Sequence, residues 1–138
     1  MTEIDASIRN HREELARVRD AIDRLGAECH LAAGIVEDMQ VALDEILTNI
    51  LNYAYTDQGE HEIRIRLRIV GGALEATIED DGKPFNPLQI APPDVRAPLR
   101  ERKIGGVGVH FVKNLMSEVS YDRVDGRNRL VLKRKLTA

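Results

Sequence analysis

The sequence has 138 residues, 43% of them hydrophobic and 31% charged, which fits a single domain over residues 1–138 with a buried core. The formal net charge of -3 gives no electrostatic support for nucleic-acid binding. The single cysteine, Cys29, excludes an internal disulfide framework, and the four histidines lack the spacing of a zinc site.

The first predicted element is a short, half-buried strand, because Ile4, Ala6 and Ile8 alternate with polar neighbours. A helix follows from about His11 to Cys29. Its apolar residues recur at helical steps and would form one buried face; they are Leu15, Val18, Ile22 and Leu25.

The segment from Val36 to Tyr53 predicts a second amphipathic helix, because its apolar residues recur at steps of three and four. These residues are Val36, Met39, Leu43, Ile46 and Ile50. Glu45, Asn49 and Asn52 form a polar stripe beside the apolar face. Buried charge is costly unless it is paired or bound, so the stripe indicates a ligand site; alternatively, it lies at the margin of the buried face. The helix alone leaves both interpretations open.

The next two predicted strands, Glu62 to Ile69 and Leu74 to Ile78, are joined near Gly71-Gly72, a favourable hairpin dipeptide. Their inner faces are apolar. The outer face of the first strand carries a row of arginines, Arg64, Arg66 and Arg68. These can lie opposite the outer residues of the second strand, which are Glu75, Thr77 and Glu79. The arginine row therefore indicates a solvated sheet face and not a nucleic-acid patch.

A carboxylate stands at the end of the second of these strands, where Asp80-Asp81-Gly82-Lys83-Pro84-Phe85 turns sharply at the glycine. Such an acid can accept a hydrogen bond from an exocyclic amine, such as that of adenine, and would reject a base with a carbonyl at that position. An Asp-Gly pair after a strand can also be an ordinary turn, and the motif alone does not decide between the two.

Periodicity is lost between Asn86 and Ile104, and a loop of this length in a small domain is usually functional or mobile. Gly105-Gly106-Val107-Gly108 follows and opens a helix, where backbone amides and the helix dipole attract phosphate. The glycines match neither a Walker A loop nor the dinucleotide pattern, and a glycine-rich hinge is the alternative interpretation. Two closing strands are predicted around Glu118 to Val124 and Asn128 to Leu136.

These elements predict an α+β, two-layer sandwich: a mostly antiparallel sheet of about four or five strands with three helices on one face. Together the motifs indicate an ATP site. Asp80 would read the base, the glycine amides would hold the phosphates, and Asn49 would supply an oxygen ligand for Mg²⁺. Glu45, one helical turn from Asn49, could then orient or deprotonate an attacking hydroxyl or water.

Three segments, in this order, resemble the boxes of the ATPase fold shared by histidine kinases, type II topoisomerases and one class of heat-shock chaperones. Glu45 to Asn49 resembles the N box, Asp80-x-Gly82 the first glycine box, and Gly106-x-Gly108 the second. The order and spacing make this resemblance specific, although each box alone is a weak signal.

The sequence more narrowly resembles the anti-sigma-factor serine kinases of bacteria. This resemblance runs through Leu43 to Asn49, Asp81 to Pro87 and Gly105 to Ser120. It implies ATP and Mg²⁺ as cofactors, Glu45 as the catalytic base, and Asn49 as the magnesium ligand. The implied nucleotide-binding residues are Asn49, Asn52, Asp80, Gly82, Pro84, Phe85, Gly105, Gly106, Val107, Gly108, Val109 and Asn128.

The same resemblance implies that the segment from Asn86 to Ile104 is an ATP lid whose cations, Arg100, Arg102 or Lys103, could contact phosphate; surface solubility explains these charges equally well. The implied substrate is a serine or threonine of an anti-anti-sigma (STAS-domain) protein, with a sigma factor as a further partner and a homodimer through the outer sheet face. No stretch is long enough to cross a bilayer, so we expect a cytoplasmic protein with no membrane or nucleic-acid partner.

The sequence departs from the family pattern at Pro84, which replaces the second glycine of the first box, and at Gly126-Arg127-Asn128, where relatives often have Gly-Thr. Asn128 could make the missing polar contact. Tyr53 stands where relatives often have histidine or lysine. The main alternative function is a non-catalytic, ATP-gated protein-binding module; Glu45 favours the kinase, since a pure binder has little use for a carboxylate beside the terminal phosphate.

Overall fold

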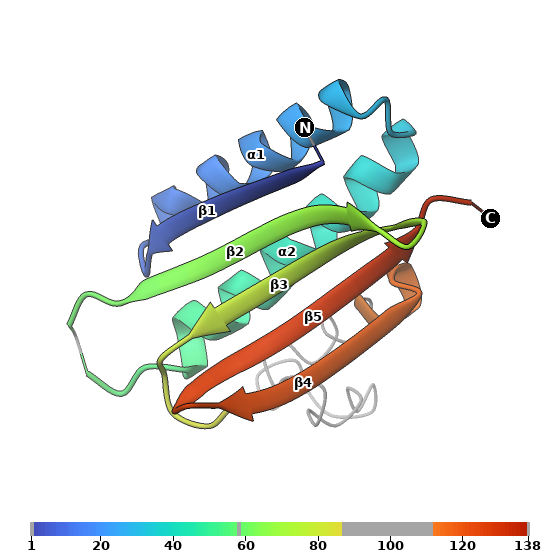
Figure 1. The fold of residues 1–138 in the computed structure, drawn as a ribbon. Helices are drawn as coiled ribbons and strands as arrows, with labels where there is room; N and C mark the ends of the chain where they lie inside the picture. The colour runs from blue at the N-terminus through green and yellow to red at the C-terminus, as the bar shows by residue number, and fades with distance from the viewer. Residues whose placement is uncertain (1, 58, 87–111, 138) are drawn as a thin grey trace, which may run out of the picture.

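The computed structural model describes residues 2–57, 59–86 and 112–137, which form a five-stranded sheet with helices on one face (Figure 1). The elements follow the order β1 (Glu3–Arg9), a 3-10 helix (Arg12–Glu14), α1 (Leu15–Glu28), α2 (Ala33–Tyr53), β2 (Glu62–Val70), β3 (Ala73–Asp80), β4 (Glu118–Val124) and β5 (Arg127–Lys135). Residues 112–115 form a further helical turn before β4. The predicted α+β sandwich is confirmed.

The sheet is antiparallel throughout, with the strand order β1-β2-β3-β5-β4. Gly71 and Gly72, with φ of +58° and +73°, connect β2 to β3, and Asp125 and Gly126, with φ of +51° and +75°, connect β4 to β5. Two successive residues with positive φ are typical of the type I′ turn, whose twist matches that of the paired strands. The hairpin predicted at Gly71-Gly72 is therefore confirmed, and a second one forms the far edge of the sheet.

The core lies between the inner face of the sheet and the helices. In β2 and β3 the inward residues are at most 1% exposed; they are Ile63, Ile65, Leu67, Leu74, Ala76 and Ile78. The helix α2 contributes Met39, Leu43, Ile46 and Leu47, also at most 1% exposed. Burying each large apolar side chain stabilises the fold by about 1.5–3 kcal/mol, so this layer dominates the stability. Within the described ranges, no helix is both long and apolar enough to cross a membrane.

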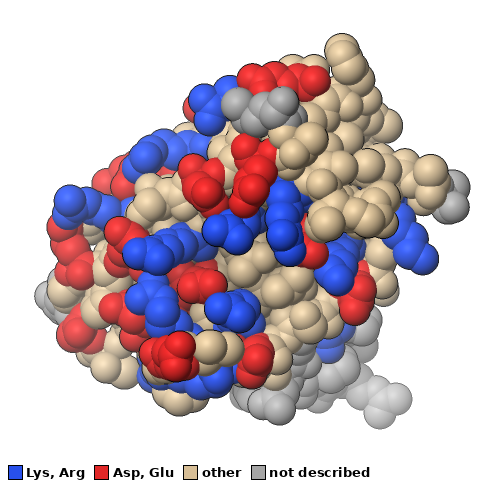
Figure 2. All heavy atoms as spheres, in the orientation of Figure 1, with Lys and Arg blue, Asp and Glu red and all other residues tan. Residues whose placement is uncertain are grey.

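The outer face of the sheet carries charges in rows that cross the strands, and Figure 2 shows positive and negative residues interspersed over it. One row alternates in sign across all five strands and consists of Glu3, Arg68, Glu75, Lys133 and Glu118. Within it, Arg68 Nε lies 2.8 Å from Glu75 Oε1 and Lys133 Nζ lies 3.9 Å from Glu75 Oε2. The predicted pairing of the arginine row with the outer residues of β3 is confirmed.

The two long helices approach closely at Gly26 of α1. A Cβ atom at this position would lie 2.6 Å from Cγ2 of Val36 in α2, well inside van der Waals contact. Gly34, in the first turn of α2, has no heavy atom within 4 Å of the corresponding position. Among the residues that the structure describes, the two long helices thus offer one glycine required by packing and one in open space.

We expect Gly26→Ala to destabilise the protein by about 1–2 kcal/mol, because overpacking against Val36 outweighs the gain in helix propensity of about 1 kcal/mol. Gly34→Ala gains the propensity without the clash and should be neutral or stabilising. Urea unfolding of both variants measures the difference. Equal stability of the two variants would contradict the proposed close contact between α1 and α2.

Candidate functional site

The three residues of the polar stripe on α2 differ in how deeply they are buried. Asn49 is only 2% exposed, Glu45 is half-buried, and Asn52 is exposed. The Asn49 Nδ2 group donates a hydrogen bond to the backbone carbonyl of Glu45 at 2.8 Å, one turn earlier in the same helix. Because the amide nitrogen is used in this way, the carbonyl oxygen of Asn49 is the atom that can meet a cation. Of the three residues, Asn49 is the one that lies inside the buried layer.

The turn after β3 contains a buried carboxylate, Asp80, which is 2% exposed. Its Oδ1 atom accepts hydrogen bonds from the backbone N–H of Gly82 and from Nδ2 of Asn128, both at 2.9 Å. Burial raises the pKa of Asp80, whereas these two hydrogen bonds and the charge of Arg123 act in the opposite direction. The site therefore holds an acid whose hydrogen bonds favour the ionised form within an apolar environment.

Gly82 lies directly against the end of α2. A Cβ atom on Gly82 would lie 2.5 Å from the carbonyl oxygen of Ala54, and Lys83 N donates to that oxygen at 2.9 Å. Because the obstructing atom belongs to the backbone, only a residue without a side chain fits here. This contact fixes the turn that carries Asp80 against the helix that carries Asn49.

A small pocket lies between α2 and the inner face of the sheet at this end. It is lined by Ile46, Ile50, Ile78, Asp80, Phe85, Tyr121, Asn128 and Leu130. Three predicted nucleotide-binding residues, Asp80, Phe85 and Asn128, are thus brought together. Glu45, Asn49 and Asn52 do not line this pocket, and Pro84 is exposed.

Asn128 of β5 is the centre of the hydrogen bonds at this site. Its Nδ2 donates to Asp80 Oδ1 and to the carbonyl oxygen of Lys83 at 2.8 Å. Its Oδ1 accepts from Phe85 N at 3.2 Å, from Arg123 Nη1 at 3.0 Å and from the hydroxyl of Tyr121. Asn128 thus contacts the predicted base-reading acid, and its own role in nucleotide binding stays a prediction.

Sequence reasoning missed Tyr121 and Arg123. Both belong to β4, and their link to the site depends on the pairing of β4 with β5, which sets Arg123 opposite Asn128. The alternation of inward and outward residues in β4 could have placed them on the inner face. Without the strand pairing, nothing in the sequence connects them to Asp80.

His61, at the start of β2, forms a second polar cluster that the sequence did not indicate. Its Nε2 lies 2.7 Å from Asp57 Oδ1, its Nδ1 lies 3.1 Å from Asp81 Oδ1, and its ring stacks on Tyr55 with the centroids 4.2 Å apart. Since both ring nitrogens face carboxylates, the doubly protonated imidazolium is favoured. The hydrogen bond to Asp57 is the main cause that raises the pKa of His61.

Several predicted residues lie outside the described residues. They are Gly105, Gly106, Val107, Gly108 and Val109 of the second glycine box, together with Arg100, Arg102 and Lys103 and all of the expected lid except Asn86. Asn86 ends the described part of the turn after β3 and is half-buried.

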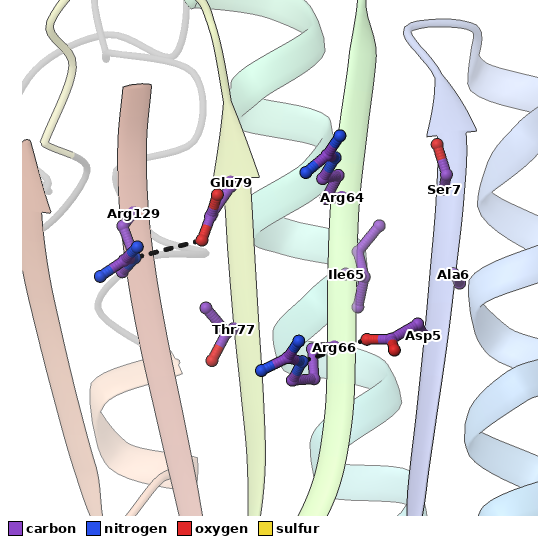
Figure 3. A pocket seen from close by; sticks show the side chains of 9 residues that line it. All are labelled: Asp5, Ala6, Ser7, Arg64, Ile65, Arg66, Thr77, Glu79 and Arg129. Atoms are coloured by element: carbon purple, nitrogen blue, oxygen red, sulfur yellow. Dashed lines mark hydrogen bonds and ion pairs between the residues drawn. The ribbon is translucent and has the colours of Figure 1, made fainter. Parts of the chain in front are cut away.

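A wider hollow lies on the outer face of the sheet, lined by residues of β1, β2, β3 and β5 (Figure 3). Its cations are paired on the same surface: Arg66 Nε lies 3.1 Å from Asp5 Oδ1, and Arg129 Nε lies 3.2 Å from Glu79 Oε1. Asp80 and Asn128 belong to the inner face, so this hollow is separate from the candidate site.

Comparison with known proteins matches residues 8–134 to the family model described as the histidine kinase-like ATPase domain. The chain is 31% identical over 94 residues to the serine/threonine-protein kinase BtrW of Bordetella bronchiseptica, and this match covers 68% of this chain and 66% of the relative. It is 30% identical over 88 residues to the serine-protein kinase RsbW of Listeria monocytogenes, covering 61% of this chain and 56% of the relative. The chain thus spans about two thirds or less of the length of these relatives.

A longer match, to the serine-protein kinase RsbW of Bacillus mycoides, is 26% identical over 134 residues and covers 94% of this chain and 83% of the relative. Among solved structures, the RsbU and RsbW domains of a Mycobacterium tuberculosis protein superpose with a TM-score of 0.71 at 17% identity. That match covers 99% of this chain and 33% of the other. It shows the same fold.

The His61 cluster predicts a pH-dependent contribution to stability. The pKa of His61 is raised from 6.5, so its contribution is complete below pH 6.5 and is lost as the pH rises through the raised value. The pKa of Asp57 is lowered from 3.8, chiefly by its hydrogen bond to His61, so the contribution is also lost as the pH falls through that lowered value. The pair should therefore stabilise the fold most between these limits.

Urea unfolding of the wild type, His61→Gln, Asp57→Asn and the double variant across this pH range measures the coupling between the two residues. We expect the coupling to be largest between pH 3.8 and pH 6.5 and to shrink on either side. NMR titration of the His61 ring serves as the control; a value at or below the ordinary histidine value would contradict the prediction.

Proposed function

Because the chain belongs to the histidine kinase-like ATPase domain family, we propose that it binds ATP with Mg²⁺ and transfers the terminal phosphoryl group to a serine or threonine of a partner protein. The observation that carries the proposal is the buried, hydrogen-bonded carboxylate of Asp80, held between the sheet and the end of α2 beside an apolar pocket. The kinase names of the relatives support the reaction class.

Asp80 would recognise the adenine base. Gly82 N–H and Asn128 Nδ2 both donate to Oδ1, which fixes the plane of the carboxylate and leaves Oδ2 to accept from an exocyclic amine. A base with a carbonyl at that position would set oxygen against oxygen and would be rejected. The pocket has a volume of about 10 Å³, less than a purine occupies, so its apolar residues, which include Ile46, Ile50 and Phe85, would move apart to admit the base and pack against its flat face.

Asn49 would hold the magnesium ion through its side-chain oxygen. Its amide nitrogen is engaged by the carbonyl of Glu45, and this hydrogen bond sets which atom faces away from the helix backbone. Magnesium usually takes one or two protein oxygens and completes its shell with phosphate and water, so one asparagine is a sufficient protein ligand. When bound, Mg²⁺ would neutralise the charge that develops on the phosphates.

Glu45 would act as the general base. It lies one helical turn before Asn49 and is half-buried, so it can face a hydroxyl near the terminal phosphate. The hydroxyl oxygen forms a bond to the γ-phosphorus while the bond from that phosphorus to its bridging oxygen breaks, and ADP leaves with the electron pair. Glu45 accepts the hydroxyl proton.

The phosphates would be held by the backbone amides of Gly105, Gly106 and Gly108, an assignment that rests on the sequence motif. The substrate implied by the resemblance is a STAS-domain protein, in a partner-switching system that also includes a sigma factor and operates in the cytoplasm. The serine-protein kinase names of the RsbW relatives agree with a hydroxyl acceptor on a protein.

ATP binding is tested by calorimetry with and without Mg²⁺. We expect Asp80→Asn to weaken ATP binding at least tenfold, because the amide can no longer serve as a pure acceptor, and Asn49→Ala to remove the magnesium dependence. GTP is the specificity control and should bind weakly to the wild type. If the folded wild type binds no ATP, the proposed function is wrong.

Phosphoryl transfer is tested with radiolabelled ATP and the STAS-domain proteins of the host. Glu45→Gln keeps the size of the side chain and removes the base, so we expect the transfer rate to fall about 10²–10⁴-fold with ATP affinity unchanged. ATP binding without transfer to any of these proteins would instead support the non-catalytic, ATP-gated module. Full activity of Glu45→Gln would exclude Glu45 as the base.

A further inference from the structure

We propose that Arg123 and Asn128 are positioning residues for Asp80: Asn128 aims the carboxylate, and Arg123 supplies the positive charge that makes it selective for adenine. This inference deepens the proposed function and rests on it. Neither Arg123 nor its contacts follow from the sequence motifs of the nucleotide boxes. Hydrogen bonds join the three residues across three neighbouring strands.

The three residues form one row across the inner face of the sheet. Asp80 of β3 is paired with Asn128 of β5, and Asn128 is paired with Arg123 of β4. Residues paired across antiparallel strands point to the same face, so the acid, the amide and the cation lie side by side. Asn128 bridges the two charges through hydrogen bonds of 2.9 Å to Asp80 Oδ1 and 3.0 Å from Arg123 Nη1.

The orientation of the Asn128 amide is determined by its neighbours. Its Nδ2 faces two acceptors, Asp80 Oδ1 and the carbonyl of Lys83, whereas its Oδ1 faces three donors, from Phe85, Tyr121 and Arg123. A flipped amide would lose all these bonds, so one orientation is strongly preferred. The carboxylate of Asp80 is consequently held by the neighbouring strand β5.

Arg123 also contacts the turn itself. Its Nη1 donates to the carbonyl oxygen of Gly82 at 2.8 Å, so the same nitrogen holds both the turn and the amide that holds Asp80. Nη1 carries two N–H groups, so one nitrogen can satisfy both acceptors. The side chain thus links the edge strand β4 to the end of β3.

The charge of Arg123 lies near an acid whose environment acts on its pKa in both directions. Burial and the neighbouring Asp81 raise the pKa of Asp80, the hydrogen bonds from Asn128 and Gly82 lower it, and the charge of Arg123 lowers it further. Burial raises the pKa of the Tyr55 hydroxyl, and the charges of Asp80 and Asp81 raise it further. A neutral Asp80 could donate a hydrogen bond to a carbonyl, so loss of the Arg123 charge should weaken rejection of a 6-oxo purine.

The test compares wild type, Arg123→Gln and Arg129→Gln. Arg129 is the matched control, since it loses the same charge on the neighbouring strand but pairs with Glu79 on the outer face. Calorimetry measures the affinities for ATP and inosine triphosphate, whose 6-oxo group replaces the amine, from pH 5 to about pH 8. We expect the ATP preference of Arg123→Gln to be reduced and, as the pH falls, to be lost at a higher pH than in the other two proteins.

NMR titration of the Asp80 carboxyl without nucleotide separates this inference from the proposed function. If the pKa of Asp80 is higher in Arg123→Gln than in the wild type and the ATP preference is reduced, the inference is supported. If the pKa of Asp80 is higher in Arg123→Gln but the wild type binds no ATP, the electrostatic link between Arg123 and Asp80 stands and only the proposed function is refuted. An unchanged pKa and an unchanged ATP preference would overturn the inference. If Arg123→Gln does not fold, Arg123→Lys provides the same test: it should keep the wild-type Asp80 pKa, and a rise there would also overturn the inference.

Discussion

The hydrogen bond between Asn128 and Asp80 is the interaction on which this end of the molecule depends. A carboxylate that is 2% exposed would cost several kcal/mol if it were left without partners. Here it is balanced by Asn128, by the N–H of Gly82 and by the nearby charge of Arg123. Because these partners come from β5, β4 and the turn, one buried acid holds together three strands at the point where they meet α2.

The two faces of the sheet serve different purposes. The inner face supplies the hydrophobic core and, at one end, the polar row that includes Asp80. Apart from the buried Glu75, the outer face carries ion pairs between partly exposed side chains, each of which contributes about 0–1 kcal/mol. The outer charges therefore add little stability but favour one strand register, since a shift by one residue would move them towards the core. A second copy of the chain docking there would have to compete with these pairs.

Periodicity was sufficient to predict the fold because each element buries one face. The bounds predicted for β4, Glu118 to Val124, agree with the structure, whereas the first helix, predicted from about His11, begins as a 3-10 turn at Arg12. A local pattern also marked Asp80 at a strand end, and the comparison with the family pattern marked Asn128. They could not reveal that Arg123 lies opposite Asn128, or that His61 lies between Asp57 and Asp81, because such contacts depend on tertiary packing.

The absence of a side chain at Gly82 has a consequence for comparing relatives of this protein. The carbonyl of Ala54 excludes any larger residue at that position, whether or not a nucleotide is ever bound. A relative that has abandoned ATP should therefore retain this glycine under selection for folding alone. Glu45 is half-buried on α2 and lies outside the Asn128 hydrogen bonds, so its identity is free to drift once phosphoryl transfer is no longer needed. With Glu45 as the base proposed above, position 45, rather than the glycine motif, is where loss of catalysis would first be recorded in an evolutionary lineage.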